Sequence, residues 1–511
     1  MKLKKLLNSI DYLDIKGDYN KFIDIKDICY HTDKIVENSI YVAIKGFKTD
    51  GHKYIKKAIE NGAIIAVVEE FTNDECVQIK VPDSRKALAD LSYRFFDEPS
   101  GELNIIGITA SNGKTTTAFM TESIFNYNNI DTAICGTVEL KYKDVFIPSV
   151  LTTPESRELQ YHIRNMADKG VENLIMEVSS AGEYLNRVRN IEYDIVTFNN
   201  FTPEHLDMHK SAENYFAEKS RLITEAKPSA YAILNMDEPK IKSLKSKTCA
   251  KVIGYSFENE NEDIFVKNID LSTGFGRFEL LINTPIEADD FIIEPQSLNV
   301  KLNVAGFSSI MNAVPAIMIG LFMGIDAEKV LRGIEQFKGV ERRFEIIYDQ
   351  DFKIIDDHYA NRINVDVTLN TLSQMDYNEL VILYALRGSR GVEVNRDIAN
   401  ETCKWMEKIR CKKLILTTSE DIVGEKDFVT EDELKVFKEE LEKAGVSARI
   451  VKTLKEALDI SLEAVKKGDV LLLGGAQGMD KAAGIILPKL AEGKSEEKKK
   501  EILKPLETRI C

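Results

Sequence analysis

The segment Asn104-Ile-Ile-Gly-Ile-Thr-Ala-Ser-Asn-Gly-Lys-Thr-Thr-Thr117 joins an apolar run to a turn that contains glycine and lysine. The apolar run predicts a buried strand, and a helix is expected to begin at Lys114. Backbone N–H groups of such a turn point at an anion, and the dipole of the helix adds to the attraction. Lys114 can reach the β and γ phosphates of a nucleotide, and the Thr115 hydroxyl can bind Mg²⁺. The segment therefore predicts a nucleotide-phosphate site formed by Asn112, Gly113, Lys114, Thr115 and Thr116.

The turn departs from the strict Walker A pattern, because Ile108 occupies the place of its first glycine. A glycine turn that precedes a helix and binds no ligand is the alternative interpretation. The preceding strand and the run Lys-Thr-Thr-Thr favour phosphate binding over this alternative. On its own, the turn indicates a nucleotide phosphate and no particular reaction.

Apolar runs with the length of buried strands recur through the rest of the chain. They include ENLIMEV, YDIVTF and AYAILN between residues 101 and 335, and FKIID, ELVILYAL, KKLILTT and DVLLLGG after residue 336. Such runs, separated by amphipathic helical stretches, predict parallel sheets with crossover helices. Residues 1–100 hold shorter β-like runs around a helical segment. For a chain of 511 residues, we predict an α/β protein of three domains, residues 1–100, 101–335 and 336–511.

The composition argues against several classes of function. The net charge is −15, whereas nucleic acids and anionic membranes attract basic surfaces. No apolar stretch approaches the ~18 residues of a membrane span, and no signal-like run follows the basic start. The seven cysteines are scattered without a CxxC pair, so neither a zinc site nor a disulfide framework is predicted. We therefore expect a cytoplasmic protein that binds neither nucleic acid nor membrane.

Further segments carry a family resemblance. They are VAIKGFKTDGH at 42–52, VPDSR at 81–85, LTTP at 151–154, MEVSS at 176–180, FNNFTPEHLDMH at 198–209 and YFAEK at 215–219. Together with the phosphate turn, they resemble the Mur ligases, and among these the MurE-type branch. That branch adds the third amino acid to UDP-N-acetylmuramoyl-L-alanyl-D-glutamate. The resemblance covers nearly the whole chain and is strongest through the first two regions.

The resemblance implies a uridine-nucleotide-binding first domain, a central P-loop-type ATPase domain and a Rossmann-like third domain. It also implies the family's reaction, in which ATP converts a substrate carboxylate to an acyl phosphate and an amine then attacks it, giving an amide, ADP and phosphate. A carboxylate is a poor electrophile until phosphorylation supplies a leaving group, and Mg²⁺ and lysine offset the repulsion between two anions. The implied partners are ATP, Mg²⁺, a UDP-sugar-peptide and an amino acid. The expected protein is a monomeric enzyme of peptidoglycan synthesis.

The resemblance also assigns catalytic and metal-binding roles. Glu177 and His205 match residues that hold Mg²⁺ in the family, together with the hydroxyl of Thr115. Glu177 follows a predicted strand, and α/β sheets bind their ligands at the carboxyl ends of strands. Lys219 matches a lysine that is carbamylated in the family, and a carbamate can bind a second Mg²⁺. The expected catalytic residues are therefore Lys114, Lys219, Glu177 and His205.

Two further groups of residues match ligand contacts of the family. Hydroxyls and a guanidinium suit a pyrophosphate and peptide carboxylates. The residues expected to contact the UDP-linked substrate are Thr32, Thr152, Thr153, Ser179 and Arg187. Those expected to contact the adenosine half of the nucleotide are Asn312, Arg343 and Asp356. In the first domain, the family's Asp-Ser-Arg motif is replaced by His31-Thr32-Asp33, which removes an arginine.

The third region departs most from the family, and it bears on the choice of amino acid. Arg390, in Gly388-Ser389-Arg390, matches the arginine expected to grip the α-carboxylate. The diaminopimelate motif Asp-Asn-Pro-Arg is replaced by Ser419-Glu420-Asp421-Ile422, and Ile422 cannot pair with a distal carboxylate. We therefore expect another amino acid, such as L-lysine, whose cationic end would pair with Glu420 or Asp421. Asp480, which ends the segment in the place of Gly-Lys-Gly-His-Glu, is also expected to contact substrate.

Two alternatives stay open. A paralogue that ligates a different UDP-linked or peptide carboxylate would also explain the departures from the family at His31, at Ala110, which replaces a glycine, and at Ala181 and Tyr359, which each replace a histidine. A degenerate nucleotide-binding regulatory protein is the other alternative. The retention of Lys114, Thr115, Glu177, His205 and Lys219 favours an enzyme, because a binding module does not need the full metal set.

Overall fold

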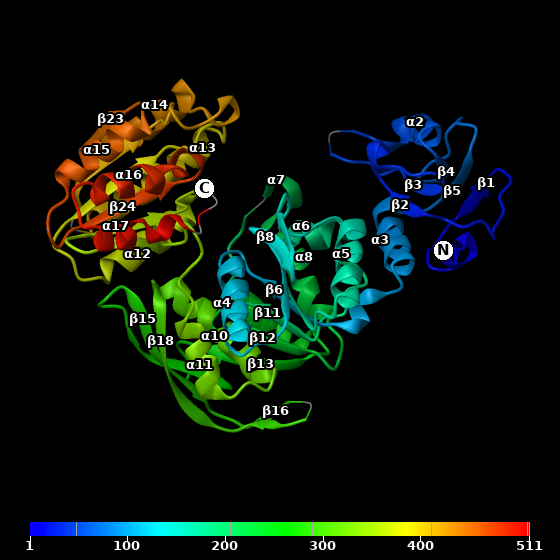
Figure 1. Ribbon diagram of the computed structural model, residues 1–511, viewed down its shortest axis with the longest axis horizontal. Coiled ribbons are helices and arrows are strands. Elements are labelled where there is room, and N and C mark those ends of the chain that lie inside the picture. The colour runs from blue at the N-terminus through cyan, green and yellow to red at the C-terminus, as the bar shows by residue number, and fades with distance from the viewer. Residues whose placement is uncertain (48, 205, 289, 410, 508, 510–511) are drawn as a thin grey trace. The chain divides into compact units, whose positions relative to one another are not determined.

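The computed structural model describes residues 1–511 apart from 48, 205, 289, 410, 508, 510 and 511 (Figure 1). The chain forms two compact units. The first comprises residues 1–266, 281–296 and 312–333, and the second comprises residues 267–280, 297–311 and 334–511. The elements that belong partly to each unit are β14 (Ile264–Asp270), β15 (Phe275–Ile282), β18 (Gln296–Ala305), α10 (Phe307–Phe322) and α11 (Ala327–Glu335).

The amino-terminal part of the first unit is a five-stranded sheet in the order β1-β5-β4-β3-β2. The strands β2 to β5 are parallel, and β1 pairs antiparallel with β5. The carboxylate of Asp83 accepts hydrogen bonds from the N–H groups of Arg85 and Lys86 and so caps α3. The strands are β1 (Asp14–Lys16), β2 (Asp27–Cys29), β3 (Ser39–Val42), β4 (Ala63–Val68) and β5 (Val77–Lys80); the helices are α1 (Leu3–Leu7), α2 (Ile55–Glu60) and α3 (Ser84–Phe95).

The central sheet of the first unit is built around the phosphate segment. Within this unit its order is β13-β12-β11-β6-β10-β7-β8-β9, parallel from β13 to β7, with β8 and β9 added antiparallel. The strands are β6 (Asn104–Thr109), β7 (Thr132–Cys135), β8 (Glu139–Tyr142), β9 (Val145–Pro148), β10 (Asn173–Glu177), β11 (Ile195–Phe198), β12 (Tyr231–Asn235) and β13 (Lys251–Ser256). The helices include α4 (Lys114–Tyr127), α5 (Ser156–Asp168), α6 (Ser180–Tyr184), α7 (Leu206–His209), α8 (Ala212–Thr224) and α9 (Pro239–Lys242).

Parallel pairing brings the phosphate turn and Glu177 to the same edge of this sheet. The strands β6 and β10 are neighbours, with Glu177 opposite Ile108. Every residue of β10 is buried, as expected for a strand whose two faces are both covered. A Cβ on Gly107 in β6 would overlap Tyr193 and Leu222, so the glycine allows α8 to pack directly on the central strand. The helix that carries Lys219 is thereby held close to the phosphate turn.

The second unit contains a six-stranded sheet in the order β19-β20-β24-β21-β22-β23. The pairing is parallel apart from the antiparallel hairpin of β19 and β20. The strands are β19 (Glu345–Asp349), β20 (Lys353–Asp357), β21 (Leu380–Ala385), β22 (Cys411–Thr417), β23 (Ala448–Val451) and β24 (Val470–Gly475). The helices are α12 (Arg362–Ser373), α13 (Val392–Met406), α14 (Glu431–Lys443), α15 (Leu454–Ala464), α16 (Ala482–Ala491) and α17 (Glu496–Leu503).

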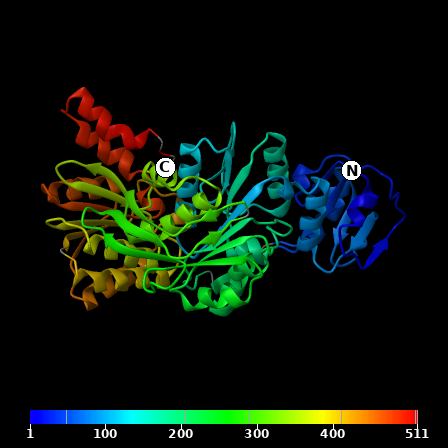
Figure 2. The same ribbon diagram turned by 90° about the horizontal axis from the view of Figure 1, so that it is seen from below.

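Helices cover both faces of the six-stranded sheet, so it has two hydrophobic cores (Figure 2). Residues of α12, α13 and α14 pack in one core, and residues of α15, α16 and α17 pack in the other. Strand β21 divides its side chains between them: Ile382 and Tyr384 face the first, whereas Leu383 and Ala385 face the second. This doubly wound sheet confirms the predicted α/β class and the Rossmann-like character of the carboxyl-terminal region.

The apolar helices of the chain are short. In the part of the chain that the structure describes, no helix combines the length and the apolar character needed to cross a membrane. The apolar residues of α10 instead lie buried, including Ile310, Val314 and Ile317.

Candidate active site

The phosphate turn lies between β6 and α4 and is braced by the residues after β11. The N–H of Ser111 donates to the carbonyl of Asn200 at 3.0 Å, and the N–H of Asn112 donates to the Asn200 side-chain oxygen at 2.9 Å. The Asn200 amide donates back to the Asn112 carbonyl at 2.8 Å. Ala110, which stands where the family has glycine, is fully buried without a left-handed φ. The methyl group at this position is therefore accommodated.

The turn ends at Gly113, whose φ of +90° favours glycine. Gly113 is also the N-cap of α4 and has no side chain to accept the first N–H groups of the helix. A Cβ on Gly113 would overlap the side-chain amide of Asn312, which is itself buried. The structure thus places Asn312 next to Gly113. The uncapped start of a 14-residue helix fits an anion such as a nucleotide phosphate.

Two lysines converge on one backbone carbonyl in this turn. Lys114 Nζ donates to the oxygen of Ala110 at 2.8 Å, and Lys219 Nζ donates to the same oxygen at 2.7 Å. Lys219 is buried, and burial together with the charge of Lys114 holds the pKa of its amine well below the usual value. The two predicted catalytic lysines therefore meet, although 105 positions of sequence separate Lys114 from Lys219.

Glu177 ends β10 beside the first turn of α4. Its carboxylate accepts hydrogen bonds from the Thr115 hydroxyl at 2.9 Å, and from the N–H and the hydroxyl of Thr137 at 2.8 and 2.9 Å. It is buried, and a Cβ on Gly136 would overlap it. Glu177 and Thr115, which are both expected to bind Mg²⁺, thus lie together at one sheet edge. Thr137, which follows β7, is a further member of this group that the sequence did not single out.

The donor set at this edge fits Mg²⁺ beside a bound nucleotide. A carboxylate and a hydroxyl supply two oxygens, and Mg²⁺ usually takes one or two protein oxygens and completes its shell with phosphates and water. Among the described residues, no cluster of three or more His, Cys, Asp or Glu side chains is placed to hold a metal ion. His205, the remaining predicted ligand, lies outside the described residues.

Three of the residues assigned to the UDP-linked substrate lie close to Glu177. The Thr153 hydroxyl contacts the carbonyl of Glu177 at 3.0 Å and the Ser179 hydroxyl at 3.0 Å, and Thr152 contacts Thr137 at 3.1 Å. Ser179 also caps α6 by accepting the N–H of Gly182. Thr153 and Ser179 therefore order the loops, while the half-buried Thr152 is the more accessible hydroxyl.

Arg187 is occupied by partners within the chain. Its guanidinium pairs with Glu155 at 2.8 Å and donates to the carbonyl of Thr153 at 3.1 Å, and its side chain is only 10% exposed. Glu155 also pairs with Arg85, at 3.2 Å. Arg187 therefore supports the loop that carries Thr152 and Thr153. Direct contact with a substrate would require it to leave Glu155.

The predicted uridine segment follows β2 of the amino-terminal sheet. Thr32 is half-buried at the start of a short 3-10 helix (Thr32–Lys34), and its carbonyl accepts the Asn61 amide. A cavity of about 120 Å³ lies beside it, with His31, Lys34, Arg157 and Glu158 among its lining residues. Arg157 joins the sheet to α5 through a bidentate pair with Asp27 at 2.9 Å. An arginine from another element thus stands close to the segment that lacks the family's own arginine.

The other two adenosine residues belong to the second unit, and their settings differ. Arg343 is exposed, and it lies between Arg342 and Phe344, which are both buried and have φ values of +56° and +51°. Asp356 at the end of β20 is fully buried. Its carboxylate accepts hydrogen bonds from Arg342 at 3.3 Å and from Arg509 at 2.7 Å. A ribose could reach Asp356 only by displacing an arginine, so the carboxylate has a structural role in this conformation.

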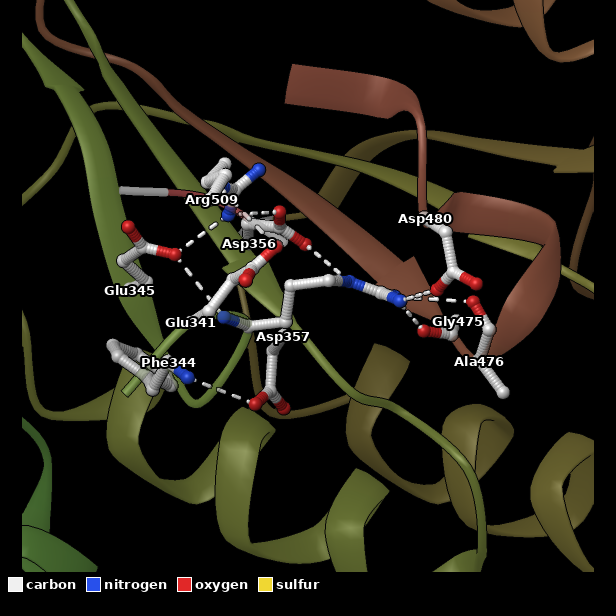
Figure 3. A network of polar contacts seen from close by, with 10 residues as sticks. Glu341, Phe344, Glu345, Asp356, Asp357, Gly475, Ala476, Asp480 and Arg509 are labelled. Carbon is white, nitrogen blue, oxygen red and sulfur yellow. Dashed lines mark hydrogen bonds and ion pairs between the residues drawn. The ribbon is translucent and has the colours of Figure 1, made fainter. Parts of the chain in front are cut away.

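Arg342 and Asp356 are part of a larger polar network (Figure 3). Figure 3 shows Glu345 and Arg509 on one side of Asp356, and Gly475, Ala476 and Asp480 on the other. The guanidinium of Arg342 reaches across to Asp480 and to the carbonyls of Gly475 and Ala476. Neither Arg342 nor Arg509 could be singled out from the sequence, because Arg342 contacts Asp480 and Arg509 contacts Asp356 from far away in the chain.

The residues expected to select the amino acid lie at the carboxyl edge of the six-stranded sheet. The partly exposed Arg390 pairs with Asp427 at 3.1 Å. Burial is the main cause that raises the pKa of Asp480, and the charge of Asp427 adds to this shift. Glu420 is exposed. Asp421 instead accepts the N–H of Leu454 at 2.7 Å and so caps α15. The expectation that Asp421 is available for a substrate cation is therefore not supported by its geometry.

His358 follows β20 at the same edge. Its N–H donates to the carbonyl of Arg342 at 2.8 Å. Burial, and then the charges of Arg343, Arg342 and Arg387, lower the pKa of its imidazole to about 3. The ring is therefore neutral near pH 7, and the charges around it are those of arginines.

Comparison with known proteins agrees with this arrangement. Three family models match: the Mur ligase middle domain over residues 108–320, the Mur ligase glutamate ligase domain over 342–477, and the Mur ligase family catalytic domain over 24–96. The UDP-N-acetylmuramoyl-L-alanyl-D-glutamate–2,6-diaminopimelate ligase of Clostridium botulinum is 32% identical over 93% of this chain and 94% of its own length. The enzyme of the same name from Bacillus velezensis is 30% identical, with the same coverage of both chains.

Solved structures show the same fold at lower identity. A UDP-N-acetylmuramoyl-L-alanyl-D-glutamate–2,6-diaminopimelate ligase superposes with a TM-score of 0.68 at 19% identity, covering 93% of both chains. The MurF ligase of Thermotoga maritima in complex with ADP gives a TM-score of 0.61 at 19% identity, covering 94% of this chain and 98% of that one. With relatives at this identity over almost its full length, and with Lys114, Thr115 and Glu177 gathered at one sheet edge, the chain belongs to the Mur ligase family and is an ATP-dependent, ADP-forming acid–amino-acid ligase.

Proposed function

We propose that this ligase adds an amino acid to UDP-N-acetylmuramoyl-L-alanyl-D-glutamate during the synthesis of peptidoglycan precursors. The supporting observation is the cluster of Lys114, Lys219, Thr115 and Glu177 around the start of α4. The names of the relatives that are about one third identical give the substrate class. The proposal places the enzyme in the cytoplasm, where ATP and UDP-linked precursors are made, and treats it as a monomer.

In the proposed reaction, Lys114 and the first N–H groups of α4 hold the phosphates of ATP. Glu177 and Thr115 would hold Mg²⁺, with His205 as the further ligand that the resemblance implies. Bound Mg²⁺ would neutralise charge as the γ-phosphate approaches the carboxylate. The chain's own contribution is to bring two anions together and to offset their repulsion, which is the main requirement for making an acyl phosphate.

Lys219 is proposed to carry a carbamate. An amine reacts with CO₂ only when it is not protonated, and burial beside Lys114 favours the neutral form of Lys219. Carbamylation would turn the group into an anion that can bind a second Mg²⁺. Its present acceptor, the carbonyl of Ala110, also accepts Lys114, so the modified side chain would lie beside the phosphate turn.

For the amino acid, we propose a substrate other than meso-diaminopimelate, with L-lysine the first to be tested. Ile422 occupies the place of the motif's arginine and packs against the core formed with α15 and α16. Asp480 is already paired with Arg342. Glu420 is exposed and its ion pair with Lys452 is long, at 3.9 Å, so its carboxylate is the acid most accessible to a cationic side chain. Because the relatives are named as diaminopimelate ligases, meso-diaminopimelate is the amino acid to compare with L-lysine in the test.

The test is phosphate release with ATP, Mg²⁺ and UDP-N-acetylmuramoyl-L-alanyl-D-glutamate against a panel of amino acids, with the product checked by mass spectrometry. Turnover with L-lysine and none with meso-diaminopimelate at equal concentration is the expected result. Turnover with meso-diaminopimelate at a comparable rate would refute the proposed selectivity and keep the ligase assignment.

A paralogous acceptor is the second candidate, and two observations favour it. Arg187 is held by Glu155 and Thr153, and the uridine segment lacks the family's arginine. If no amino acid is ligated to the standard precursor while ATP binding is intact, a different UDP-linked or peptide carboxylate is indicated. A panel of such acceptors with the same phosphate assay would then identify it.

A further inference from the structure

A buried carboxylate organises the loop that carries Arg390. The loop follows β21 and contains Gly388, Ser389 and Gly391, and Ser389 and Gly391 have φ values of +55° and +91°. A Cβ on Gly388 would overlap the backbone of Asp427 and Phe428, so the loop lies directly against that segment. The hydroxyl of Ser389 donates to the carbonyl of Phe428 at 3.1 Å.

Three successive N–H groups of this loop donate to Glu433, in the first turn of α14. The N–H of Ser389 donates to Oε2 at 3.0 Å, and those of Arg390 and Gly391 donate to Oε1 at 2.9 and 2.8 Å. The N–H and the hydroxyl of Thr430 also donate to Oε2, at 2.9 and 3.1 Å. A carboxylate has about four lone-pair positions, so these five donors saturate it.

The environment of Glu433 keeps it charged. Glu433 is only 2% exposed, and burial alone would raise the pKa of its carboxyl group. The N–H groups of Thr430, Ser389, Arg390 and Gly391 outweigh burial and hold the pKa below the usual value. The negative charge therefore stays in place at neutral pH and attracts the loop N–H groups.

We propose that Glu433 is a positioning residue that fixes where Arg390 presents its guanidinium to the incoming amino acid. This rests on the proposed function and on the expectation from the sequence that Arg390 grips the α-carboxylate of the amino acid. Because Glu433 holds the N–H groups on both sides of the Arg390 Cα, only the side chain of Arg390 retains freedom. That side chain is 38% exposed and rests on Asp427 at 3.1 Å. Preorganisation of this kind lowers the cost of ordering an arginine when a carboxylate binds.

A role limited to helix capping is the competing explanation, because Glu433 and Thr430 form a capping box at the start of α14. The chain offers a matched control. Thr430→Ala removes the hydroxyl of the capping box and leaves every loop contact to Glu433 in place. Glu433→Gln keeps the size of the side chain but replaces one accepting oxygen by an NH₂ donor, which cannot accept a loop N–H.

The experiment measures KM for each substrate and kcat in the full-length protein. Glu433→Gln is expected to raise KM for the incoming amino acid about tenfold, with KM for ATP and for the UDP-linked substrate changed less than about twofold. Thr430→Ala should lower the melting temperature and leave all three KM values within about twofold. An unchanged amino-acid KM in Glu433→Gln, or equal increases in the two variants, would overturn the proposal.

Hydrogen exchange of the amides of residues 389–391 provides a readout that does not depend on activity. These amides should exchange faster in Glu433→Gln and at the wild-type rate in Thr430→Ala. If the wild type ligates no amino acid, the proposed function fails, whereas exchange still decides whether Glu433 holds the loop. If Glu433→Gln does not fold, Glu433→Asp, which keeps the charge but is one methylene shorter, allows the same comparisons.

Discussion

Lys114 and Lys219 share one acceptor, and this arrangement makes their roles separable by mutation. Lys114→Ala removes the cation at the start of α4 and leaves Lys219 bonded to Ala110. We expect ADP formation to fall at least about a hundredfold, because the lost charge acts on the transferring phosphoryl group. A coupled ADP assay measures the rate, and circular dichroism checks the fold. Lys245→Ala, at an exposed position of the same unit, is the control and should retain full activity.

Glu183 supplies a pH dependence of stability in the first unit. Burial is the main cause that raises its pKa to about 8, followed by Arg221, which opposes the shift, and by Glu225 and Glu218, which add to it. Between about pH 4.5 and pH 8, the folded protein therefore holds a proton that the unfolded chain has released, so stability falls as pH rises. The slope from this group is at most about 1.4 kcal/mol per pH unit.

Glu183→Gln should remove this slope and gain stability relative to the wild type above pH 8. Calorimetric melting temperatures of both proteins at several pH values from 5 to 9 provide the measurement. Glu213→Gln, at an exposed position on α8 whose charge is not among those that shift the pKa of Glu183, is the matched control and should follow the wild-type profile. Parallel profiles for Glu183→Gln and wild type would contradict the prediction.

For single residues, the sequence predicts those parts of the site whose residues are contiguous in the chain. It misses residues whose partners are far away in the sequence. The strand, the turn and Lys114 are contiguous, so the phosphate turn could be identified from its order alone. Thr137 could not, because it reaches Glu177 from a neighbouring strand that is 40 positions away. Arg342 could not be identified either, since its partner Asp480 is 138 positions away. The pairing of Arg187 with Glu155 shows that a motif residue can match while its side chain is already occupied.

Among the elements, β19 and β20 depend on an arginine from the end of the described chain. Arg509 pairs with Glu345 and Asp356 and is 4% exposed. Arg509→Ala leaves two acids close together with only Arg342 to compensate Asp356, and breaking a buried pair of this kind costs about 3 kcal/mol. We expect a lower melting temperature for the second unit. Denaturant unfolding followed by circular dichroism measures the loss.

The exposed Arg449 on β23 provides the comparison for this substitution. Arg449→Ala should change the free energy of unfolding by less than about 0.5 kcal/mol, because exposed charges contribute little. A loss in Arg509→Ala no larger than this would mean that the buried pairs of Arg509 do not stabilise the hairpin. The sequence pattern predicted β20 through the run FKIID, but it predicted neither β19 nor the dependence of this hairpin on Arg509.

Most of the second unit has the features of an independently folding domain. Apart from Ala305, the buried residues of both its cores lie between Phe344 and Ile502. We expect a fragment of residues 336–511 to fold cooperatively, with a sharp thermal transition and native-like circular dichroism. A broad transition with strong dye binding would contradict this. ATP and Mg²⁺ should not shift its transition, because the phosphate turn lies in the other unit.

The class of fold was predictable at this scale because buried parallel strands leave long apolar runs, and the family resemblance supplied the rest. The motifs also indicated the ligase chemistry. They could not indicate that Asp421 caps α15 or that Asp480 pairs with Arg342, since both depend on how loops close over the sheet edge. Residue-by-residue matching to the family was therefore least informative about the roles of side chains in the third domain.

The side chains of β21 alternate between two cores, so this strand tolerates less change in sequence than the loops at the same edge of the sheet. Each of its side chains is committed to one helical layer, so inserting a residue into the strand would exchange the layers and is strongly disfavoured. The loops that follow β21, β22 and β24 carry Arg390, Glu420 and Asp480, and they place only a few side chains in the cores, such as Leu386 and Met479. Exposed side chains of these loops can therefore change without unfolding the domain. Selectivity for the amino acid can therefore be altered along a single rim of the protein, while the scaffold stays unchanged.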